Sequence, residues 1–282
     1  MKKILILGSS GQIGSHLSTY LKDIGHDVVE FDILENSGND LRLPESSEIY
    51  IADCDFVYFA AFDVGGSKYL KKYQHSFEFI DNNMRIMLNT FNLLKKYEKP
   101  FIFFSTQMVN AENSAYGLLK AIGEQYTSAI NGIAVRLWNV YGVELYGDKS
   151  HVITDFILSA KNNNKIEMLT DGNEERQLLH VEDCCDCLNI IMDNYYDISR
   201  SDKLHITSFN WVKIYDVADI VSKIFDGVRV IPSDNIDNVQ YNNRIEPSKD
   251  ILRYWSPKIS LDDGISNITK SIIESDNYRG NS

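Results

Sequence analysis

Three polar side chains in the segment 105–120 have the types and spacing that proton-transfer chemistry needs. Tyr116 and Lys120 stand four residues apart, so on a helix their side chains would lie on one face. Thr106 adds a hydroxyl ten residues before Tyr116. A phenol has a pKa of about 10, and a positive charge one helical turn away lowers it toward the range useful for a base. The Tyr-Lys pair alone is a weak signal, because the same spacing is common in helices with ordinary polar faces.

A glycine-rich turn near the start of the chain could supply the cofactor for such chemistry. Gly8, Gly11 and Gly14 follow an apolar run at 2–7 that reads as a strand, and a helical pattern follows at 12–22. Without side chains, backbone N–H groups can approach a pyrophosphate, whose charge the positive end of the helix dipole also favours. In this context the turn predicts a dinucleotide site, although a glycine turn that binds nothing is the alternative.

Asp32 indicates which dinucleotide would bind. It ends the second predicted strand, 18 residues after Gly14. A carboxylate there can accept hydrogen bonds from the adenosine ribose hydroxyls, and it would repel the 2′-phosphate of NADP. The sequence therefore favours NAD, although Arg42 stands near enough along the chain to reverse that preference. Asp32 could also be an ordinary strand-end turn residue.

Strand-like apolar runs alternate with helical patterns over the first half of the chain. The runs lie at 2–7, 27–31, 56–61, 101–104 and 133–137. Helical spacing of apolar residues occurs at 12–22, around 45–51, at 77–97 and at 116–130. This alternation predicts right-handed crossovers and a parallel sheet covered on both faces. The expected fold class is therefore α/β, with a Rossmann-type doubly wound parallel sheet.

The alternation weakens beyond Gly142. Helical patterns occur at 152–162, 181–195, 215–225 and 261–273, with a short strand at 204–207, and three prolines punctuate the region from 232 to 257. We therefore expect a NAD-binding Rossmann domain formed by 1–141, to which 178–208 return. Residues 142–177 and 209–282 are expected to form a smaller, irregular C-terminal lobe that binds substrate.

Composition and charge exclude several classes of protein. A net charge of -12 over 282 residues argues against non-specific attraction to nucleic acid or to anionic membranes. No apolar run reaches the about 20 residues of a membrane helix, and the N-terminal run is too short for a signal peptide, so a cytoplasmic protein is expected. Three of the four cysteines crowd at 184–187, but no second Cys or His pair completes a ligand set, so no metal is expected.

A series of motifs in a fixed order resembles the nucleotide-sugar epimerase/dehydratase group of extended short-chain dehydrogenases/reductases. The match runs from Lys3 to about Lys270. The motifs are GSSGQIG at 8–14, Asp40 with Leu41, Ala60 with Ala61, Asn82 with Asn83, Ser105 with Thr106, YGLLK at 116–120, RLWNVYG at 136–142, RQLLHVED at 176–183, EPSK at 246–249 and WSPKISLDDG at 255–264. Each is common alone, and the order is what makes them specific.

The resemblance implies that NAD is the cofactor and that a set of matched positions contacts it. These positions are Gly8, Gly11, Gln12, Ile13, Gly14, Asp32, Asp40, Leu41, Ala60, Ala61, Asn83, Tyr116, Lys120 and Trp138. Periodicity does not yield these roles. From the residues alone, the two alanines read as small core residues, and Asn83 reads as a helix cap or an exposed polar residue.

The resemblance also makes Thr106, Tyr116 and Lys120 catalytic. Tyr116 would take the proton of a sugar hydroxyl while hydride leaves the carbon, Lys120 would lower the pKa of the phenol and hold the nicotinamide ribose, and Thr106 would bond the same sugar oxygen. One departure concerns the segment between Thr106 and Tyr116, which is shorter than in relatives and shapes the sugar pocket. Alone, Thr106 could simply cap its own backbone.

Neighbouring positions narrow the reaction that the resemblance implies. Gln107 and Met108 stand where family dehydratases have Asp and Glu, and Met108 also replaces the Cys of members that epimerise beside a ketone. The sequence therefore favours a nucleotide-sugar epimerase acting at C4 through a transient 4-keto sugar. A 4-keto-sugar-nucleotide reductase that uses NAD(P)H is the first alternative, because 61–66 and 150–153 are similar to GDP-fucose synthase. A non-catalytic dinucleotide-binding sensor or scaffold is the second, because of the short segment.

The expected substrate is a nucleotide-diphosphate sugar, whose phosphates need basic residues in so acidic a protein. The resemblance places four residues against it: Asn139, His151, Arg176 and Arg244. His151 and Arg244 could equally be surface residues. The two long helical segments, 77–97 and 116–130, pair into a four-helix bundle in this family, so a homodimer is expected, with no nucleic-acid or membrane partner.

Overall fold

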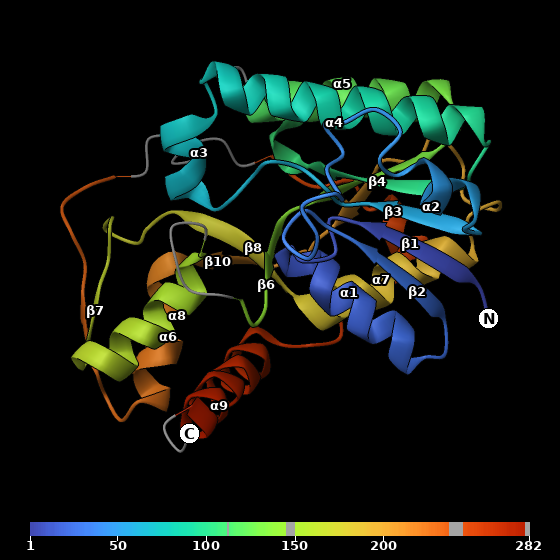
Figure 1. The fold of residues 1–282 in the computed structure, drawn as a ribbon. Coiled ribbons are helices and arrows are strands. Elements are labelled where there is room, and N and C mark those ends of the chain that lie inside the picture. Colours follow the sequence, from blue (N-terminus) through green and yellow to red (C-terminus); the bar gives the residue numbers. More distant parts are fainter. Residues whose placement is uncertain (112, 145–149, 237–244, 280–282) are drawn as a thin grey trace. The chain divides into compact units, whose positions relative to one another are not determined.

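The computed structural model describes residues 1–111, 113–144, 150–236 and 245–279, and the chain divides into two compact units. Unit 1 consists of Met1–Trp138, Cys184–Ile206 and Ser248–Ser256. Unit 2 consists of Asn139–Asp183, Thr207–Pro247 and Pro257–Ser282. Each unit therefore draws on separate stretches of sequence (Figure 1).

Unit 1 is built on a six-stranded parallel sheet. Its strands, in spatial order, are β2 (Asp27–Phe31), β1 (Lys3–Leu7), β3 (Phe56–Phe59), β4 (Phe101–Thr106), β5 (Ile133–Leu137) and β9 (Leu204–Ile206). The chain moves outward from β1 to β2 and then returns to the other side of β1 with β3. The order therefore reverses between β1 and β3, and in such sheets ligands bind beyond the carboxyl ends of the strands at this switch point.

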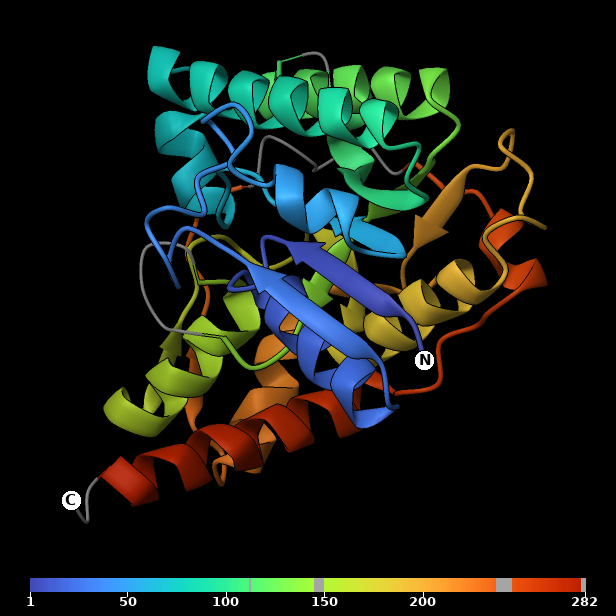
Figure 2. The ribbon, with the colours of Figure 1, turned by 45° about the vertical axis from the view of Figure 1, so that its right-hand side comes forward.

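The strands of unit 1 are apolar because helices cover both faces of the sheet. Every residue of β3 and β4 is buried, as expected for central parallel strands. Helices α4 (Phe77–Lys96) and α5 (Ala115–Ala129) lie side by side on one face, and α1 (Gln12–Asp23) and α7 (Val181–Asp193) lie on the other (Figures 1 and 2). Under α4 and α5, rings of Phe59, Phe91 and Phe103 pack edge to face.

Serine caps set the starting points of the two long helices. Ser76 accepts a hydrogen bond from Phe79 N at 3.2 Å and begins α4, and Ser114 accepts one from Gly117 N at 3.0 Å and begins α5. The short helices α2 (Glu48–Ala52) and α3 (Ser67–Tyr73) and the 3-10 turns η1 (Gln107–Asn110) and η2 (Asp250–Arg253) complete unit 1. The cap at Ser114 fixes which residues of α5 face the sheet.

The described residues of unit 2 form two small sheets and three helices. In one sheet β6 (Asn139–Tyr141) runs parallel to β8 (Glu175–His180), which pairs antiparallel with β10 (Trp211–Lys213); in the other β7 (Lys165–Glu167) pairs with β11 (Arg229–Ile231). Helices α6 (Val152–Asn163), α8 (Ile214–Ile224) and α9 (Leu261–Arg279) surround a separate apolar core. A Cβ at Gly264 would lie 2.1 Å from the Tyr141 hydroxyl, so Tyr141 would have to move to admit a side chain there.

The structure confirms the predicted α/β fold with its parallel sheet, and each helix and strand predicted from the sequence is present with small shifts at its ends. The expected strand at 56–61 stops at Phe59, and the strand expected at 101–104 continues to Thr106. The sequence analysis did not predict α3 or the strands β6, β7, β8, β10 and β11. In the described residues, no helix is both long and apolar enough to cross a membrane.

Candidate active site

The glycine turn after β1 packs so closely that two of its glycines cannot carry a side chain. Gly8 has a φ of +91°, and a Cβ on it would lie 2.6 Å from Ala61 N. A Cβ on Gly14 would lie 2.1 Å from the carbonyl oxygen of Gly8. The turn therefore meets the loop that follows β3 backbone to backbone, which explains why Ala60 and Ala61 are small.

The start of α1 fits the pyrophosphate of a dinucleotide. Gly11 is the N-cap, no side chain caps the helix, and its first turn has no acidic residue. The first N–H groups of α1 are therefore free of a side-chain cap at the positive end of the helix dipole. The Nε2 of Gln12 is buried and has no hydrogen-bond partner among the residues that the structure describes, so it is a donor available to a ligand at this turn.

Two carboxylates stand at the end of β2 against the glycine turn. Asp32 accepts hydrogen bonds from Ser10 N at 3.1 Å and from Leu34 N at 2.9 Å, and each of its oxygens has a further lone pair for a ribose hydroxyl. Glu35 accepts hydrogen bonds from the hydroxyls of Ser9 at 3.2 Å and Ser10 at 3.1 Å. The sequence reading used Asp32 and missed Glu35, although it lies one turn further along.

Arg42 is bound to a neighbouring carboxylate. Its guanidinium donates to Asp40 through Nε at 2.8 Å and Nη2 at 2.7 Å, and Nη1 donates to Asn82 at 3.3 Å. These bonds lower the pKa of the Asp40 carboxyl below its ordinary value, even though partial burial acts in the opposite direction. Leu41 between them is buried, and its carbonyl accepts from Asn89 at 3.0 Å. The charge of Arg42 is therefore largely matched by Asp40.

Asn83 has a structural task that the sequence did not reveal. It is fully buried, so its reading as an exposed polar residue is wrong. Its Oδ1 accepts from Asp63 N at 2.7 Å, and its Nδ2 donates to the carbonyls of Asp63 at 3.1 Å and Phe79 at 2.9 Å. Asn83 thus ties the loop after β3 to α4. Its contact with the cofactor stays a prediction.

The three predicted catalytic residues come together where β4 ends and α5 begins. Thr106 is the last residue of β4, and its hydroxyl accepts from Met108 N at 3.2 Å. The phenol of Tyr116 is hydrogen-bonded to the side chain of Thr106. Lys120 lies one turn beyond Tyr116 on α5, and its Nζ donates to the carbonyl of Phe104 at 2.6 Å. The sequence therefore grouped these side chains correctly.

The short link between Thr106 and Tyr116 is made possible by a glycine. After β4 the chain forms the single turn η1 and then reaches the cap at Ser114. A Cβ on Gly117 would lie 2.1 Å from the carbonyl oxygen of Met108, so η1 packs directly on the first turn of α5. A side chain at Gly117 would push the two apart, and Tyr116 with them.

Burial dominates the titration of both ionisable groups in the trio. It raises the pKa of Tyr116 to about 12, and the hydrogen bond from Thr106 only partly opposes this. Burial also lowers the pKa of Lys120 to about 7. The sequence-based expectation that Lys120 lowers the pKa of the phenol is thus not met by the protein alone, because desolvation outweighs it and Nζ is directed to the Phe104 carbonyl. Further positive charge is needed to ionise Tyr116.

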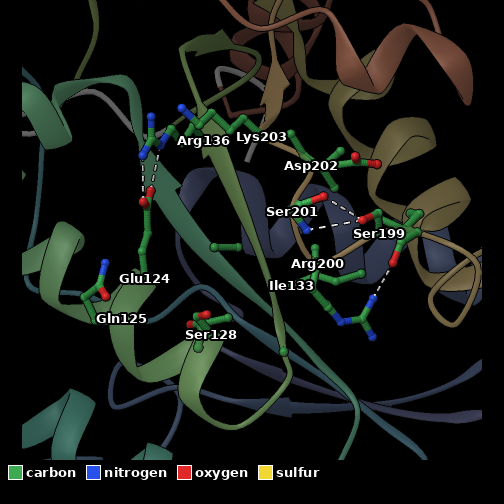
Figure 3. A pocket seen from close by; sticks show the side chains of 15 residues that line it. Glu124, Gln125, Ser128, Ile133, Arg136, Ser199, Arg200, Ser201, Asp202 and Lys203 are labelled. Atoms are coloured by element: carbon green, nitrogen blue, oxygen red, sulfur yellow. Dashed lines mark hydrogen bonds and ion pairs between the residues drawn. The ribbon is translucent and has the colours of Figure 1, made fainter.

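A network of hydrogen bonds and an ion pair holds the end of β4 against α5 and β5. Glu124 accepts a hydrogen bond from the Ser105 hydroxyl at 2.6 Å, and it binds Arg136 on β5 through two bonds of 2.8 Å. Glu124 and Arg136 line an open pocket of about 240 Å³, which residues 198–204 also line, and Figure 3 shows their paired bonds. The pocket contains none of the predicted site residues. The sequence missed Glu124, although it stands one helical turn beyond Lys120.

Trp138 at the end of β5 is held by a histidine. Its indole Nε1 donates to Nδ1 of His205 on β9 at 3.2 Å, and both side chains are buried. Burial, helped by the nearby charge of Arg136, lowers the pKa of His205 to about 4, so the imidazole is a neutral acceptor at neutral pH. Trp138 therefore has a fixed orientation, and its packing beside nicotinamide stays a prediction.

The predicted substrate contacts belong to unit 2. Asn139 begins β6 and its Nδ2 donates to the carbonyl of Gln177 at 3.2 Å. Arg176 on β8 is partly buried, and its Nη1 donates to the carbonyl of Glu175 at 2.8 Å. Arg244 lies outside the described residues. Their contacts with a sugar nucleotide stay predictions.

His151 forms a pair with a buried carboxylate. Glu144 binds both the backbone N and the Nδ1 of His151 at 2.7 Å each. Burial pushes the pKa of Glu144 up, but its hydrogen bonds with His151 and the charge of the imidazole leave that pKa below its ordinary value. The imidazole ring is thus oriented by one nitrogen, which leaves the other for a further partner.

The described part of the chain contains no cluster of metal ligands. Cys184, Cys185 and Cys187 lie on α7 with buried side chains, and Cys54 is buried as well. These side chains fill the space under the sheet, which is the ordinary role of a small apolar residue.

Comparison with known proteins places these features in a family. The model of the "NAD dependent epimerase/dehydratase family" matches residues 4–206. Among relatives, UDP-glucuronic acid decarboxylase 1 of Arabidopsis thaliana is 23% identical over 99% of this chain and 72% of its own length. GDP-L-fucose synthase 1 of the same plant is 23% identical over 94% and 91%. The solved structure of UDP-glucose 4-epimerase with UDP-glucose from Thermotoga maritima matches with a TM-score of 0.82 and 19% identity, over 97% of this chain and 99% of that one.

The burial of Lys120 predicts a pH-dependent effect of replacing it. Its folded-state pKa of about 7 lies below the ordinary 10.5, so the unfolded chain holds more protons between these values and Lys120 destabilises the fold most at the low end. Lys120→Met should therefore raise the free energy of unfolding at pH 7, by at most about 4 kcal/mol. The gain should shrink as the pH rises toward 10.

Urea unfolding of both proteins at several pH values measures this difference. Lys95→Met, which replaces an exposed lysine near the end of α4, is the matched control and should show no such trend. A difference for Lys120→Met that stays constant from pH 7 to 10 would show that the folded protein keeps Lys120 fully charged.

Proposed function

The chain belongs to the NAD dependent epimerase/dehydratase family, and on this premise we propose that it is an NAD-dependent nucleotide-sugar epimerase that inverts C4 through a transient 4-keto sugar. The observation that carries the proposal is the hydrogen-bonded group of Thr106 and Tyr116 with Lys120 one turn away. It stands at the carboxyl edge of a sheet whose glycine turn fits a dinucleotide.

Each member of the trio has a separate task in this reaction. When bound, a nicotinamide ring would take a hydride from the sugar carbon and return it, and in its oxidised form it would bring a positive charge. Tyr116 as phenolate takes the proton of the C4 hydroxyl and later gives it back. Thr106 holds the same sugar oxygen through its hydroxyl, and Lys120 orients the ribose with its ammonium. Between the two half-reactions the 4-keto sugar rotates in the site, so that the hydride returns to its opposite face.

The residues after Thr106 favour epimerisation at C4 over reactions that break other bonds. Elimination of water, or inversion beside a ketone, needs a second acid or base close to the sugar. Gln107 and Met108 cannot transfer a proton, and the carbonyl of Met108 is packed on Gly117. The likeness to a solved 4-epimerase supports the same reading.

The proposed substrate is a nucleotide-diphosphate sugar held by residues of unit 2. Arg176 and Arg244 would bind its phosphates, and Asn139 and His151 would bind the sugar or its phosphate. The pairing of His151 with Glu144 supports this assignment, because it fixes the imidazole ring for a second hydrogen bond. The four cysteines are buried thiols, which fit a reducing compartment and so support a cytoplasmic location.

A 4-keto-sugar reductase is the second candidate. It is favoured by the likeness to a GDP-L-fucose synthase along nearly the whole chain and by the Ser-His-Val-Ile sequence around His151. The two reactions share the trio and differ in cofactor balance, because a reductase consumes reduced cofactor and an epimerase does not. A non-catalytic sensor or scaffold is the third, and the hydrogen bond between Thr106 and Tyr116, with Lys120 one turn away, argues against it.

Turnover of sugar nucleotides tests the proposal. With NAD present, the protein should interconvert C4 epimers of a UDP- or GDP-hexose, seen by NMR, without a net change in absorbance at 340 nm. Tyr116→Phe should lower kcat by about 10²–10⁴-fold, because the base is lost. Tyr126→Phe, on the same helix, is the control and should keep its activity. Full activity of Tyr116→Phe would refute the assigned base, and oxidation of reduced cofactor by a 4-keto sugar would favour the reductase.

The carboxylates of Asp32 and Glu35 predict a preference for NAD over NADP. Both lie against the glycine turn, and a 2′-phosphate placed there would meet two negative charges, while Arg42 is occupied by Asp40. Titration calorimetry should give a Kd for NADP at least about tenfold above that for NAD, and Glu35→Gln should narrow this gap several-fold at low salt. Glu98→Gln, an exposed carboxylate before β4, is the control. Tighter binding of NADP by the unaltered protein would overturn the cofactor assignment.

An exposed apolar stripe on α4 and α5 supports a homodimer. It consists of Phe77, Ile80, Met84, Leu88, Leu118 and Tyr126, all exposed and set at helical spacing on two adjacent helices. Light scattering should therefore give twice the 32.3 kDa mass of one chain. Leu88→Glu should shift the protein toward monomer, whereas Ile49→Glu, on α2, should not. A monomer at micromolar concentration would contradict this assignment.

A further inference from the structure

Phe62 touches both ionisable members of the catalytic trio. It follows Ala61 in the loop after β3, and its ring is half-buried against the core of unit 1. The Nζ of Lys120 lies 3.8 Å from the centre of this ring. The ring of Tyr116 meets it edge to face, with centroids 5.7 Å apart and an interplanar angle of 73°. One aromatic side chain therefore contacts the phenol and the ammonium at the same time.

Lys120 lacks the carboxylate partner that a buried ammonium usually has. Its side chain is 3% exposed, and its one hydrogen bond in the described residues goes to the Phe104 carbonyl. The nearest acidic residue on its own helix, Glu124, is bound to Ser105 and Arg136. On β4, the polar groups nearby are the hydroxyls of Ser105 and Thr106, which are neutral.

The loop after β3 also presents a carboxylate, and it is engaged elsewhere. Asp63 accepts hydrogen bonds from the Tyr69 hydroxyl at 2.6 Å and from Asn82 at 3.1 Å. Burial is the cause of the lowered pKa of Lys120, because it disfavours the ammonium form. Any group that favours the ammonium form of Lys120 must therefore be an uncharged group that faces it.

Two aromatic faces meet this need. The Phe62 ring lies at 3.8 Å and the Phe103 ring at 4.8 Å from Nζ, both within the range in which a ring face attracts a cation. Such attraction is strongest where water is excluded, as it is here. Phe103 belongs to the fully buried strand β4, whereas Phe62 sits on the loop that borders the cofactor turn. Phe62 is therefore the ring whose identity can vary without rebuilding the sheet.

We propose that Phe62 is a positioning residue of this active site: its ring face holds the Lys120 side chain beside Tyr116 and favours the ammonium form of Lys120 against the cost of burial. The inference rests on the proposed function in one respect, because the ammonium is the form of Lys120 that the reaction uses. The edge contact with Tyr116 has a second effect. It limits rotation of the phenol ring, so that the hydroxyl stays on Thr106.

The titration of Lys120 in the free protein tests the proposal without any sugar or cofactor. Lysine labelled with ¹³C at Cε gives one NMR signal per residue, and Lys120→Arg identifies the signal of Lys120. Phe62→Leu keeps the apolar bulk and removes the ring face, so the pKa of Lys120 should fall by about one unit. Phe62→Tyr keeps the ring and should leave that pKa close to its value in the unaltered protein.

Two further variants separate the ring effect from damage to the fold. Phe59→Leu removes a ring from the same core that packs on Phe91 and Phe103, so it should move the Lys120 titration less than Phe62→Leu does. Phe62→Trp offers the strongest ring face for a cation and should raise the pKa of Lys120. This variant decides the matter if Phe62→Leu fails to fold. An unchanged or lower pKa in Phe62→Trp, or equal shifts in Phe62→Leu and Phe59→Leu, would overturn the proposal.

The pH profile of turnover connects the inference to catalysis. If the ammonium is needed, kcat/KM declines as Lys120 loses its proton, and Phe62→Leu should move this alkaline limb about one unit toward lower pH. KM for the sugar nucleotide should change little. A shift of the Lys120 titration in a protein that turns over no sugar nucleotide would leave the role of Phe62 intact and refute the epimerase. Normal turnover by Phe62→Leu with an unchanged Lys120 titration would refute the role of Phe62 and leave the epimerase assignment intact.

Discussion

Burial of a phenol beside an ammonium is the physical constraint on which this active site depends. Tyr116 and Lys120 are both removed from water, and desolvation disfavours the charged form of each. It therefore raises the pKa of Tyr116 and lowers the pKa of Lys120. Without a cofactor, both groups are held toward their neutral forms. Hydrogen bonds from Thr106 and to Phe104, and the nearby ring faces, set the geometry that remains. The protein thus supplies position, and the charge that makes the phenol a base must come with the cofactor.

That geometry is a consequence of how close the backbone elements approach one another. Gly8 lets the first turn touch the loop after β3, and Gly117 lets η1 touch the start of α5. In both places a Cβ would lie within 3 Å of backbone atoms, so the contact cannot form with any other residue unless the backbone moves. The switch in strand order between β1 and β3 brings the first of these contacts to the edge of the sheet where dinucleotides bind.

The sequence predicted the α/β fold because buried parallel strands and amphipathic helices leave strong periodic signals. It also grouped Thr106, Tyr116 and Lys120, since strand end and helical spacing fix where such residues point. It could not predict β7 or β11, whose three residues are too few to show alternation. It missed Glu35, Phe62 and Glu124 for another reason. Each acts through a contact with a residue distant in sequence, and taken alone each reads as an ordinary surface carboxylate or core ring.

The negative charges near the site lie at the glycine turn, and the trio of Thr106, Tyr116 and Lys120 contains no carboxylate. The carboxylates of Asp32 and Glu35 lie against the glycine turn, where they would meet the ribose hydroxyls of a bound dinucleotide. The trio lies beyond them and contains no carboxylate, so a positive nicotinamide ring would find no counter-ion there except a phenolate. Under the proposed function, an oxidised nicotinamide ring would favour ionisation of Tyr116, because opposite charges attract strongly where water is excluded. Tyr116 would then serve as a base only while the oxidised cofactor is bound.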